Sequence, residues 1–249
     1  MSILIADTPQ TARRSALSIV DVSKAFGKKF VLQGIDLDVA QGEIVSIVGR
    51  SGCGKSTLLR VLSGLEMPSS GHIVVGGKSL TGLNRAARLM FQDAALLPWR
   101  TVLQNVELAA PNRDRHAARQ ALTHVGLGER ANDWPTVLSG GQRQRVALAR
   151  ALSSRATILL FDEPLGALDA LTRLDMQALI ERLWDETGFT AVLITHDVEE
   201  AVALADRVLV MEAGHFVLEQ PITLPRPRDR TAREFVDLRE RILSRVLQS

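Results

Sequence analysis

Residues 49–56 have the composition and spacing of a loop that binds phosphate. They read Gly-Arg-Ser-Gly-Cys-Gly-Lys-Ser, which fits the pattern G-x-x-x-x-G-K-[ST]. Glycines let backbone N–H groups turn inward around phosphate oxygens, and a helix beginning near Lys55 would point its positive dipole end at the same anion. Lys55 can reach the β- and γ-phosphates of a nucleotide, while the Ser56 hydroxyl can ligate Mg²⁺. The predicted phosphate contacts are Gly49, Arg50, Ser51, Gly52, Cys53, Gly54, Lys55, Ser56 and Thr57.

Two acidic residues follow an apolar run further along the chain. Residues 158–161 are Ile-Leu-Leu-Phe, and Asp162 and Glu163 come next. Ligands of open parallel sheets bind at the carboxyl ends of the strands. We therefore expect Asp162 to bind Mg²⁺, usually through water, and Glu163 to orient or deprotonate an attacking water, a step worth roughly 10²–10⁴-fold. An ordinary loop start is the alternative for such an acidic pair, and the phosphate loop upstream disfavours it.

A third motif, at residues 138–142, is Leu-Ser-Gly-Gly-Gln. Ser139 is suited to cap a helix, and the two glycines would leave backbone N–H groups bare at its start, which makes a second phosphate-binding surface. The chain here resembles the ABC ATPases, whose signature sequence this is. The resemblance implies that two subunits pair head to tail. Ser139 and Gly141 of one subunit would then lie against the γ-phosphate of the ATP bound by the other.

The resemblance also assigns roles to residues that occur in the order of the family's motifs. Gln92 resembles the glutamine that senses Mg²⁺ and the attacking water and that begins the segment contacting a membrane subunit. Asp169 resembles the residue of the loop that crosses the dimer interface, and His196 the switch histidine that contacts the γ-phosphate. Phe26 matches the aromatic position that stacks on adenine, with Phe30 as an alternative.

These inferences define three sets of site residues and two bound species, ATP and Mg²⁺. The expected catalytic residues are Glu163, His196, Gln92 and Lys55. The expected Mg²⁺ ligands are Ser56, Gln92 and Asp162. The expected nucleotide contacts beyond the phosphate loop are Phe26, Ser139, Gly140, Gly141, Gln142 and Asp169.

Segments between the motifs resemble one branch of the family, the bacterial importer subunits of the nitrate, taurine and aliphatic-sulfonate group. The stretches that carry this resemblance are residues 91–108, 163–177 and 195–211. Pro-Arg-Pro-Arg at 225–228, with Trp99 and Trp134, is most similar to the aliphatic-sulfonate ATPases. The resemblance thus implies an ATP-hydrolysing subunit that energises an aliphatic-sulfonate importer. Taurine, nitrate or a related small anion is the alternative cargo.

The same resemblance implies a set of partners. They are a second copy of the chain, two integral membrane permease subunits, and a periplasmic or lipid-anchored solute-binding protein, with no nucleic acid. The chain would act peripherally at the cytoplasmic face of the inner membrane. A soluble ABC ATPase of repair or translation is a rival hypothesis, but only about 81 residues without heptads separate Thr57 from Leu138. A non-catalytic cassette is a second rival, and the presence of all four expected catalytic residues argues against it.

Composition agrees with a globular intracellular protein. The 249 residues are 46% hydrophobic and 23% charged, with a formal net charge of +2, so no polyanionic partner is required. Cys53 is the single cysteine, which excludes an intrachain disulfide and suits a reducing cytosol. The first fifteen residues lack the apolar core of a secretory signal. No stretch reaches the ~20 apolar residues that cross a bilayer, so we expect another chain to form the pore.

The element pattern predicts an α/β protein, and the resemblance implies a P-loop NTPase core of the ABC ATPase type. Short apolar strands at 43–48, 87–91, 156–161, 190–195 and 208–211 alternate with helices, which indicates a mostly parallel sheet. Residues 17–39 predict an N-terminal antiparallel β subdomain, and about 93–155 an inserted α-helical subdomain. The expected organisation is a leader at 1–15, an ABC ATPase domain at 16–225 and a basic amphipathic helix at 226–249.

The expected C-terminal helix has an apolar face and a positive charge. Phe235, Leu238, Ile242 and Val246 share one face, which we expect to pack on the protein. Residues 221–249 contain seven Arg and four acidic residues, a difference of +3. The charge could meet lipid headgroups or another subunit, or could be a solvated helix face.

Overall fold

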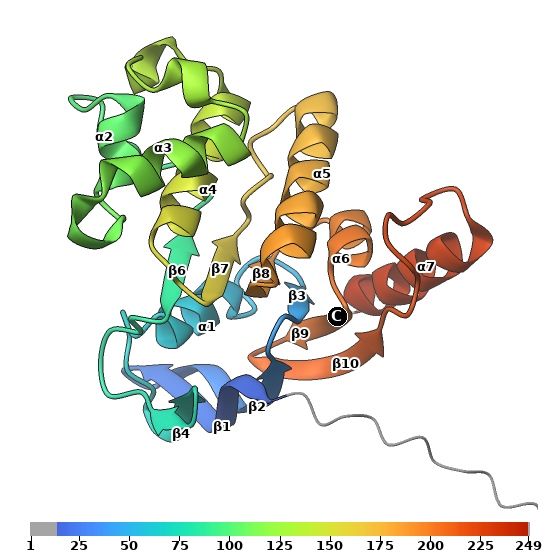
Figure 1. Ribbon diagram of the computed structural model, residues 1–249. Helices are drawn as coiled ribbons and strands as arrows, with labels where there is room; N and C mark the ends of the chain where they lie inside the picture. Colours follow the sequence, from blue (N-terminus) through green and yellow to red (C-terminus); the bar gives the residue numbers. More distant parts are fainter. Residues whose placement is uncertain (1–13, 249) are drawn as a thin grey trace, which may run out of the picture.

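The larger of two β-sheets forms the centre of the molecule. The computed structural model describes residues 14–248, so the predicted leader at 1–15 lies almost wholly outside the described residues. The sheet has the order β10-β9-β3-β8-β7-β6 (Figure 1). Its strands are β3 (Ile44–Val48), β6 (Ala87–Met90), β7 (Ile158–Asp162), β8 (Thr190–Ile194), β9 (Arg207–Glu212) and β10 (His215–Pro221). All pairs are parallel except β9 with β10, a hairpin at one edge.

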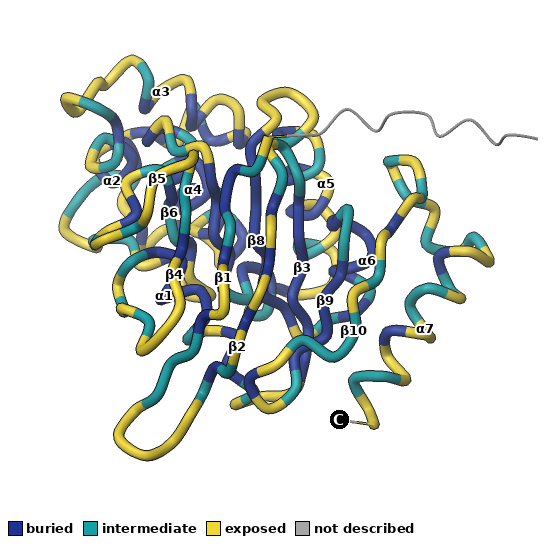
Figure 2. Tube along the Cα trace, turned by 90° about the horizontal axis from the view of Figure 1, so that it is seen from below, coloured by how far each residue is buried: buried dark blue, intermediate teal, exposed yellow. Residues whose placement is uncertain are grey.

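The smaller sheet is antiparallel and has the order β2-β1-β4-β5. Its strands are β1 (Ser15–Phe26), β2 (Lys29–Ala40), β4 (Ser70–Val75) and β5 (Lys78–Ser79). One apolar core lies between this sheet, helix α1 (Lys55–Leu62) and one face of the larger sheet. The central strands β3 and β8 are buried along their whole length (Figure 2). Their continuous Val, Ile and Leu runs suit strands that are covered on both faces.

The remaining helices form a second core on the other face of the larger sheet. They are α2 (Val102–Glu107), α3 (Arg115–His124), α4 (Gly140–Ser153), α5 (Ala170–Thr187), α6 (Val198–Leu204) and α7 (Arg233–Leu247). Helices α2, α3 and α4 lie between β6 and β7 in the chain and gather at one end of the molecule, away from β1 and β2 (Figure 1). The predicted fold class, with its mostly parallel sheet, antiparallel β subdomain and helical insert, is confirmed.

The C-terminal helix begins later than predicted. Helix α7 starts at Arg233, not near residue 226, because Pro225 and Pro227 cannot continue a helix and the arginines around them bond elsewhere. Its apolar face packs on the second core, where Phe235 and Ile242 are fully buried, as predicted.

The arginines before α7 are bound within the chain. Arg226 stacks 4.2 Å from the centroid of the Trp184 ring and donates to Asp206 at 2.7 Å. Arg228 donates to the carbonyl oxygens of Val202 and Ala205, each at 2.6 Å, at the end of α6. Those carbonyls have no partner within the helix, so Arg228 satisfies the end of α6. The positive charge of residues 226–228 therefore fastens the strap between β10 and α7 to the core.

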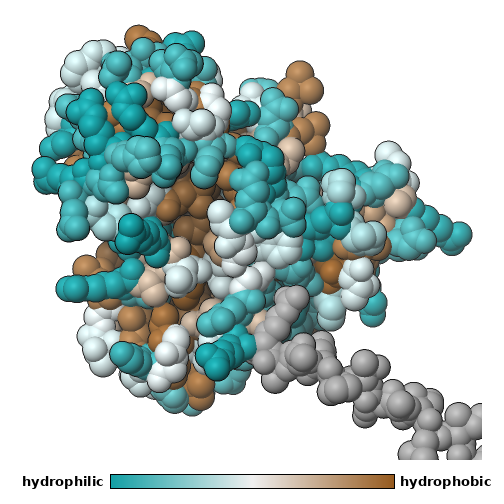
Figure 3. Space-filling model, in the orientation of Figure 1, coloured by the Kyte–Doolittle hydropathy of each residue, from teal (hydrophilic) through white to brown (hydrophobic). Residues whose placement is uncertain are grey.

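Two further observations bear on the molecule's surroundings. No helix within residues 14–248 is both long and apolar enough to cross a bilayer. On the face seen in Figure 3, apolar residues line the hollow between the helical insert and the smaller sheet, and others lie at the upper right of the view.

A buried acid lies beneath the start of α6. Glu200 is 3% exposed and accepts a hydrogen bond from the Thr195 hydroxyl at 2.8 Å. Burial raises the pKa of Glu200 to about 7, with the nearby charge of Asp197 adding to the increase and the Thr195 hydrogen bond opposing it. The folded state thus holds this proton more tightly than the unfolded state does.

The raised pKa predicts a pH-dependent stability. The stabilising contribution of protonated Glu200 is complete below the unfolded pKa and is lost as pH rises through about 7. Glu200→Gln cannot lose a proton, so between pH 4.5 and 8 its free energy of unfolding should rise relative to wild type by up to about 3 kcal/mol. Urea midpoints at several pH values measure this difference. The exposed Glu240→Gln is the control, and an equal pH dependence in both variants would contradict the assignment.

Candidate active site

The phosphate loop joins β3 to α1 and is held closed against the β9–β10 hairpin. A Cβ atom on Gly49 would lie 2.3 Å from the Met211 carbonyl oxygen, so only glycine permits this approach. The Lys55 ammonium donates to the carbonyl oxygens of Gly49 at 2.7 Å and Arg50 at 3.0 Å. A cavity of about 290 Å³ opens above the loop, lined by Val31, Ser51, Gly52, Gly54, Lys55, Ser56, Thr57 and Glu163. The loop and an expected catalytic acid therefore share one cavity.

Two of the three expected Mg²⁺ ligands, Ser56 and Asp162, are in contact although they lie far apart in the chain. The Ser56 hydroxyl donates to Asp162 Oδ1 at 3.1 Å. Burial raises the pKa of Asp162, the Ser56 hydrogen bond lowers it, and the neighbouring charge of Glu163 raises it. Among residues 14–248, no group of three or more His, Cys, Asp or Glu side chains is placed to hold a metal ion by itself. Two oxygen ligands fit Mg²⁺, which takes few protein ligands and completes its shell with water and phosphate.

Glu163 and His196 form the second contact of the site. Glu163 Oε2 lies 3.0 Å from His196 Nδ1, and the proton between them depends on the histidine tautomer. Glu163 has a φ of 48°, a left-handed backbone conformation that costs a non-glycine residue about 1 kcal/mol or more. The strained backbone therefore lies at the residue that is expected to orient or deprotonate the attacking water.

Gln92 reaches the same place from a third segment. A Cβ atom on Gly166 would lie 3.2 Å from Gln92 Nε2 and 3.6 Å from Glu163 Oε2. The absent side chain of Gly166 thus leaves room for both groups. All four expected catalytic residues follow parallel strands or the phosphate loop, so the fold gathers them at one edge of the sheet.

The signature motif begins α4, as predicted. Ser139 caps the helix, accepting from Gln142 N at 3.2 Å, and Gln142 Oε1 accepts from Ser139 N at 2.9 Å. This reciprocal pair is a capping box. A Cβ atom on Gly141 would lie 2.3 Å from Thr172 Cγ2, so this glycine lets α4 pack closely on α5. No residue of the signature lines the phosphate-loop cavity of its own chain.

Asp169 and the two candidate adenine contacts lie outside the cavity above the phosphate loop. Asp169 caps α5 by accepting from Thr172 N at 3.0 Å, and hydrogen bonds from Thr172 lower its pKa. Phe26 and Phe30 lie at the β1–β2 turn with 49% and 57% of their surface exposed. Neither ring lines the cavity above the phosphate loop, so the choice between them stays open.

Three buried polar residues near the site were not predicted from the sequence. Gln144 donates to three backbone carbonyls beside the site, Asn105 bonds to residues 97–101, and Glu200 bonds to Thr195. Gln144 shares a helix face with Leu148 and Ala151 at helical spacing. A polar residue on such an apolar face must have buried hydrogen-bond partners, so this spacing is the feature of the sequence that could have indicated Gln144.

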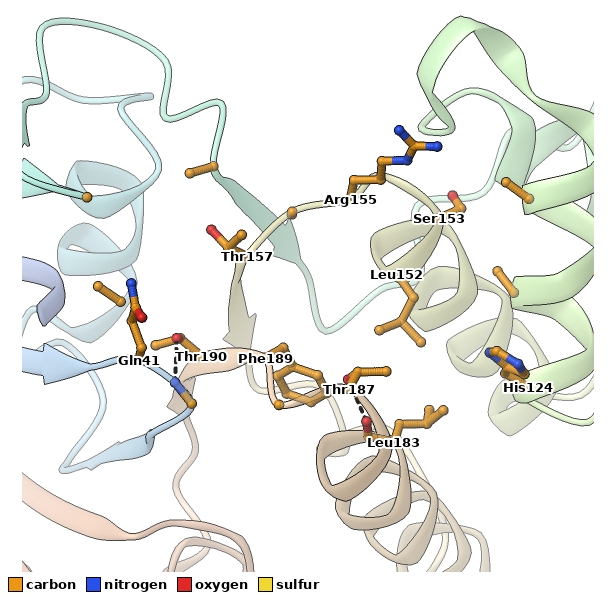
Figure 4. Close-up of a pocket in the computed structure, with 18 of the residues that line it drawn as sticks. Gln41, His124, Leu152, Ser153, Arg155, Thr157, Leu183, Thr187, Phe189 and Thr190 are labelled. Carbon is orange, nitrogen blue, oxygen red and sulfur yellow. Dashed lines mark hydrogen bonds between the residues drawn. The ribbon is translucent and has the colours of Figure 1, made fainter. Parts of the chain in front are cut away.

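A wide cavity lies elsewhere in the molecule (Figure 4). It has a volume of about 690 Å³ and is bordered by Thr157 and Thr190, at the amino ends of β7 and β8, and by Leu152, Leu183 and Phe189. No acidic residue and no part of the phosphate loop lines it. It therefore lies at the opposite edge of the sheet from the candidate active site.

Comparison with known proteins gives a consistent result. The ABC transporter family model matches residues 32–166. The chain is 58% identical over 240 residues to the aliphatic sulfonates import ATP-binding protein SsuB 1 of Burkholderia cenocepacia, covering 96% of this chain and 75% of that one. It is 60% identical over 236 residues to the SsuB protein of Ralstonia nicotianae, covering 95% and 83%.

Solved structures agree with the sequence relatives. An ATP-binding cassette solved as a dimer in a post-hydrolysis state with ADP and Pi has a TM-score of 0.73 and 31% identity, covering 84% of this chain and 100% of that one. The cbiO1 protein of Clostridium perfringens has a TM-score of 0.78 and 25% identity, covering 94% and 99%. With the motifs, the strand order and these relatives in agreement, the chain belongs to the ABC transporter family of ATP-binding proteins.

Proposed function

We propose that this chain is the ATP-hydrolysing subunit of a bacterial importer for aliphatic sulfonates. The single observation that carries the activity is the meeting of the phosphate loop, the Ser56–Asp162 pair and the Glu163–His196 pair at one edge of the sheet. Relatives that are 58% and 60% identical over nearly the whole chain, and named as aliphatic-sulfonate import proteins, support the cargo.

The phosphate loop binds ATP through its inward N–H groups and Lys55. In the structure Lys55 donates to two loop carbonyls, and phosphate oxygens would replace these acceptors. Ser56, Asp162 and Gln92 would hold Mg²⁺, which would supply positive charge beside the phosphate oxygens. Phe26 or Phe30 stacks on adenine at the β1–β2 turn.

Hydrolysis follows from the contacts around Glu163. A water oxygen attacks the γ-phosphorus, its proton passes to the Glu163 carboxylate, and the bond from the γ-phosphorus to ADP breaks. His196 orients Glu163 through the 3.0 Å contact and stabilises charge on the γ-phosphate together with Lys55. Gln92 and Glu163 both border Gly166, and Gln92 positions the water from that side. Positioning and electrostatics account for the rate.

The complete site requires a second copy of the chain. The signature N–H groups at the start of α4 do not line the cavity of their own phosphate loop, which supports a head-to-tail dimer in which Ser139, Gly140, Gly141 and Gln142 close over the partner's ATP. Asp169 lies beside the same interface. Exposed Phe91 and Trp99, close to Gln92 in the chain, support contact with a membrane permease subunit at the cytoplasmic face of the inner membrane. A solute-binding protein would deliver the cargo.

Glu163→Gln tests the catalytic assignment. The variant keeps the shape of the side chain and loses the proton acceptor, so ATP binding should persist while kcat falls roughly 10²–10⁴-fold. Phosphate release and a nucleotide-binding titration measure the two quantities. Loss of hydrolysis should also favour the closed dimer in size-exclusion chromatography.

The control for this variant is Glu186→Gln. Glu186 pairs with Arg182 on the exposed side of α5 and should leave both quantities unchanged. Normal turnover by Glu163→Gln would remove Glu163 from the mechanism.

Cys53 offers a chemical test of the phosphate loop. Its Sγ lies 3.9 Å from Lys55 Nζ, so an alkyl group on this sulfur would crowd the lysine that binds phosphate. We predict that alkylation of Cys53 blocks ATP binding and that ATP protects the thiol. Mass spectrometry measures labelling. The control is Cys53→Ser, which has no thiol to alkylate and receives the same treatment. Complete labelling with unchanged ATP affinity would contradict the prediction.

The cargo is tested in the assembled transporter. ATP hydrolysis by the chain copurified with its permease and solute-binding partners should rise several-fold with an alkanesulfonate and less with taurine or nitrate. Stimulation by taurine or nitrate, without stimulation by the alkanesulfonate, would assign a different cargo. Hydrolysis by the free chain should not respond to any of these solutes, so the cargo can be wrong while the ATPase activity stands.

A further inference from the structure

One buried side chain of α4 binds both loops that hold the catalytic residues. Gln144 Nε2 lies 3.3 Å from the carbonyl oxygen of Phe91, 2.9 Å from that of Gln92 and 2.7 Å from that of Pro164. Phe91 and Gln92 follow β6, and Pro164 follows Glu163. A single amide group therefore joins the loop of Gln92 to the loop of Glu163.

No second side chain makes this connection within residues 14–248. The loop after β6 is fastened to the helical insert at two other places: Arg150 donates to Ala94 O at 2.8 Å and Ala95 O at 2.9 Å, and Asn105 bonds to Leu97. These contacts tie that loop to the helices and leave the Glu163 loop untouched. Gln144 alone donates from α4 to both loops.

The surroundings of Gln144 are costly for an amide. Its side chain is 3% exposed, and the NH₂ group faces three carbonyls while Oε1 is buried without a partner. An unsatisfied buried acceptor destabilises a protein, so an apolar side chain of the same size would suit the packing at least as well. The hydrogen bonds that Gln144 donates are therefore the feature that packing does not explain.

Gln144 also has a fixed relation to the signature. It lies four residues after Gly140, one helical turn, and a regular helix moves as a unit over that length. A cavity of about 330 Å³ bordered by Gln92, Gly140, Gln144 and Leu168 separates the signature from the two loops. Any displacement of the start of α4 thus reaches Gln92 and Glu163 through the Gln144 amide.

We propose that Gln144 is a positioning residue that couples the placement of the signature to that of Gln92 and Glu163. This inference rests on the proposed function. When the signature closes over the partner's ATP, α4 carries the Gln144 amide with it, and the amide sets the backbone from which Gln92 and Glu163 reach the attacking water. Gln144 touches no reacting atom, so it acts on turnover and not on nucleotide affinity.

Gln144→Met is the first test. Methionine fills a similar volume and donates no hydrogen bond, so both loops lose their shared anchor while the core stays packed. We expect kcat to fall about tenfold or more, because small misplacements of catalytic groups are expensive, with the Kd for ATP changed less than twofold. The matched control is Gln177→Met, a buried glutamine of α5 that bonds to Arg230 and to neither loop.

Gln144→Glu gives a readout that a purely structural role would not. An ionised carboxylate would face three carbonyl oxygens, whereas the protonated acid can donate to one of them. The ratio of its kcat to that of wild type should therefore rise as pH falls from 8 to 6. A ratio that does not vary with pH would count against the donor role.

Amide hydrogen exchange tests the coupling without reference to activity. Peptides that cover residues 91–95 and 163–168 should exchange faster in Gln144→Met than in wild type, and equally fast in Gln177→Met and wild type. Unchanged kcat with unchanged exchange overturns the proposal, as does a proportional loss of kcat and ATP affinity. If wild type fails to hydrolyse ATP, the proposed function falls, while faster exchange in both peptides would still support the coupling.

Discussion

The parallel pairing of β3, β8, β7 and β6 is the constraint on which the site depends. Parallel neighbours end at the same edge, so the segments after these four strands must meet there, although they are spread along the chain from Gly49 to His196. The strand order also determines which of these segments are neighbours. The phosphate loop follows β3, His196 follows β8, Glu163 follows β7 and Gln92 follows β6, so His196 and Glu163 come from adjacent strands.

The helical insert is attached to the same sheet, between β6 and β7. It leaves the sheet after β6, at the edge that carries the site, and returns at the amino end of β7, at the opposite edge. Its helices hold the first connection by bonding to backbone carbonyls, from Asn105 on α2 and from Gln144 and Arg150 on α4. The loop that carries Gln92 is thereby fixed to the insert as well as to the sheet.

The sequence was sufficient for the groups that act on phosphate and insufficient for those that hold them. The phosphate loop, Asp162–Glu163 and the capping role of Ser139 follow from local spacing, because each motif includes the strand or helix end that positions it. Gln144 and Arg228 bond to carbonyls far away in the chain, and a carbonyl has no sequence signature. The later start of α7 has two causes: Pro225 and Pro227 cannot continue a helix, and the arginines beside them bond to the core.

Irregular backbone at a buried site needs hydrogen-bond donors from other parts of the chain, which regular elements do not need. Strands and helices satisfy their own carbonyls, whereas turning segments such as 91–95 and 163–166 need donors from elsewhere. In this fold the donors are long side chains on rigid helices, so the loops take their position from helix placement and not from their own side chains. Such a loop can vary in sequence and still follow the helix, because the acceptor belongs to the backbone. The donor has no such freedom, so the position of both loops depends on a glutamine at this place on α4.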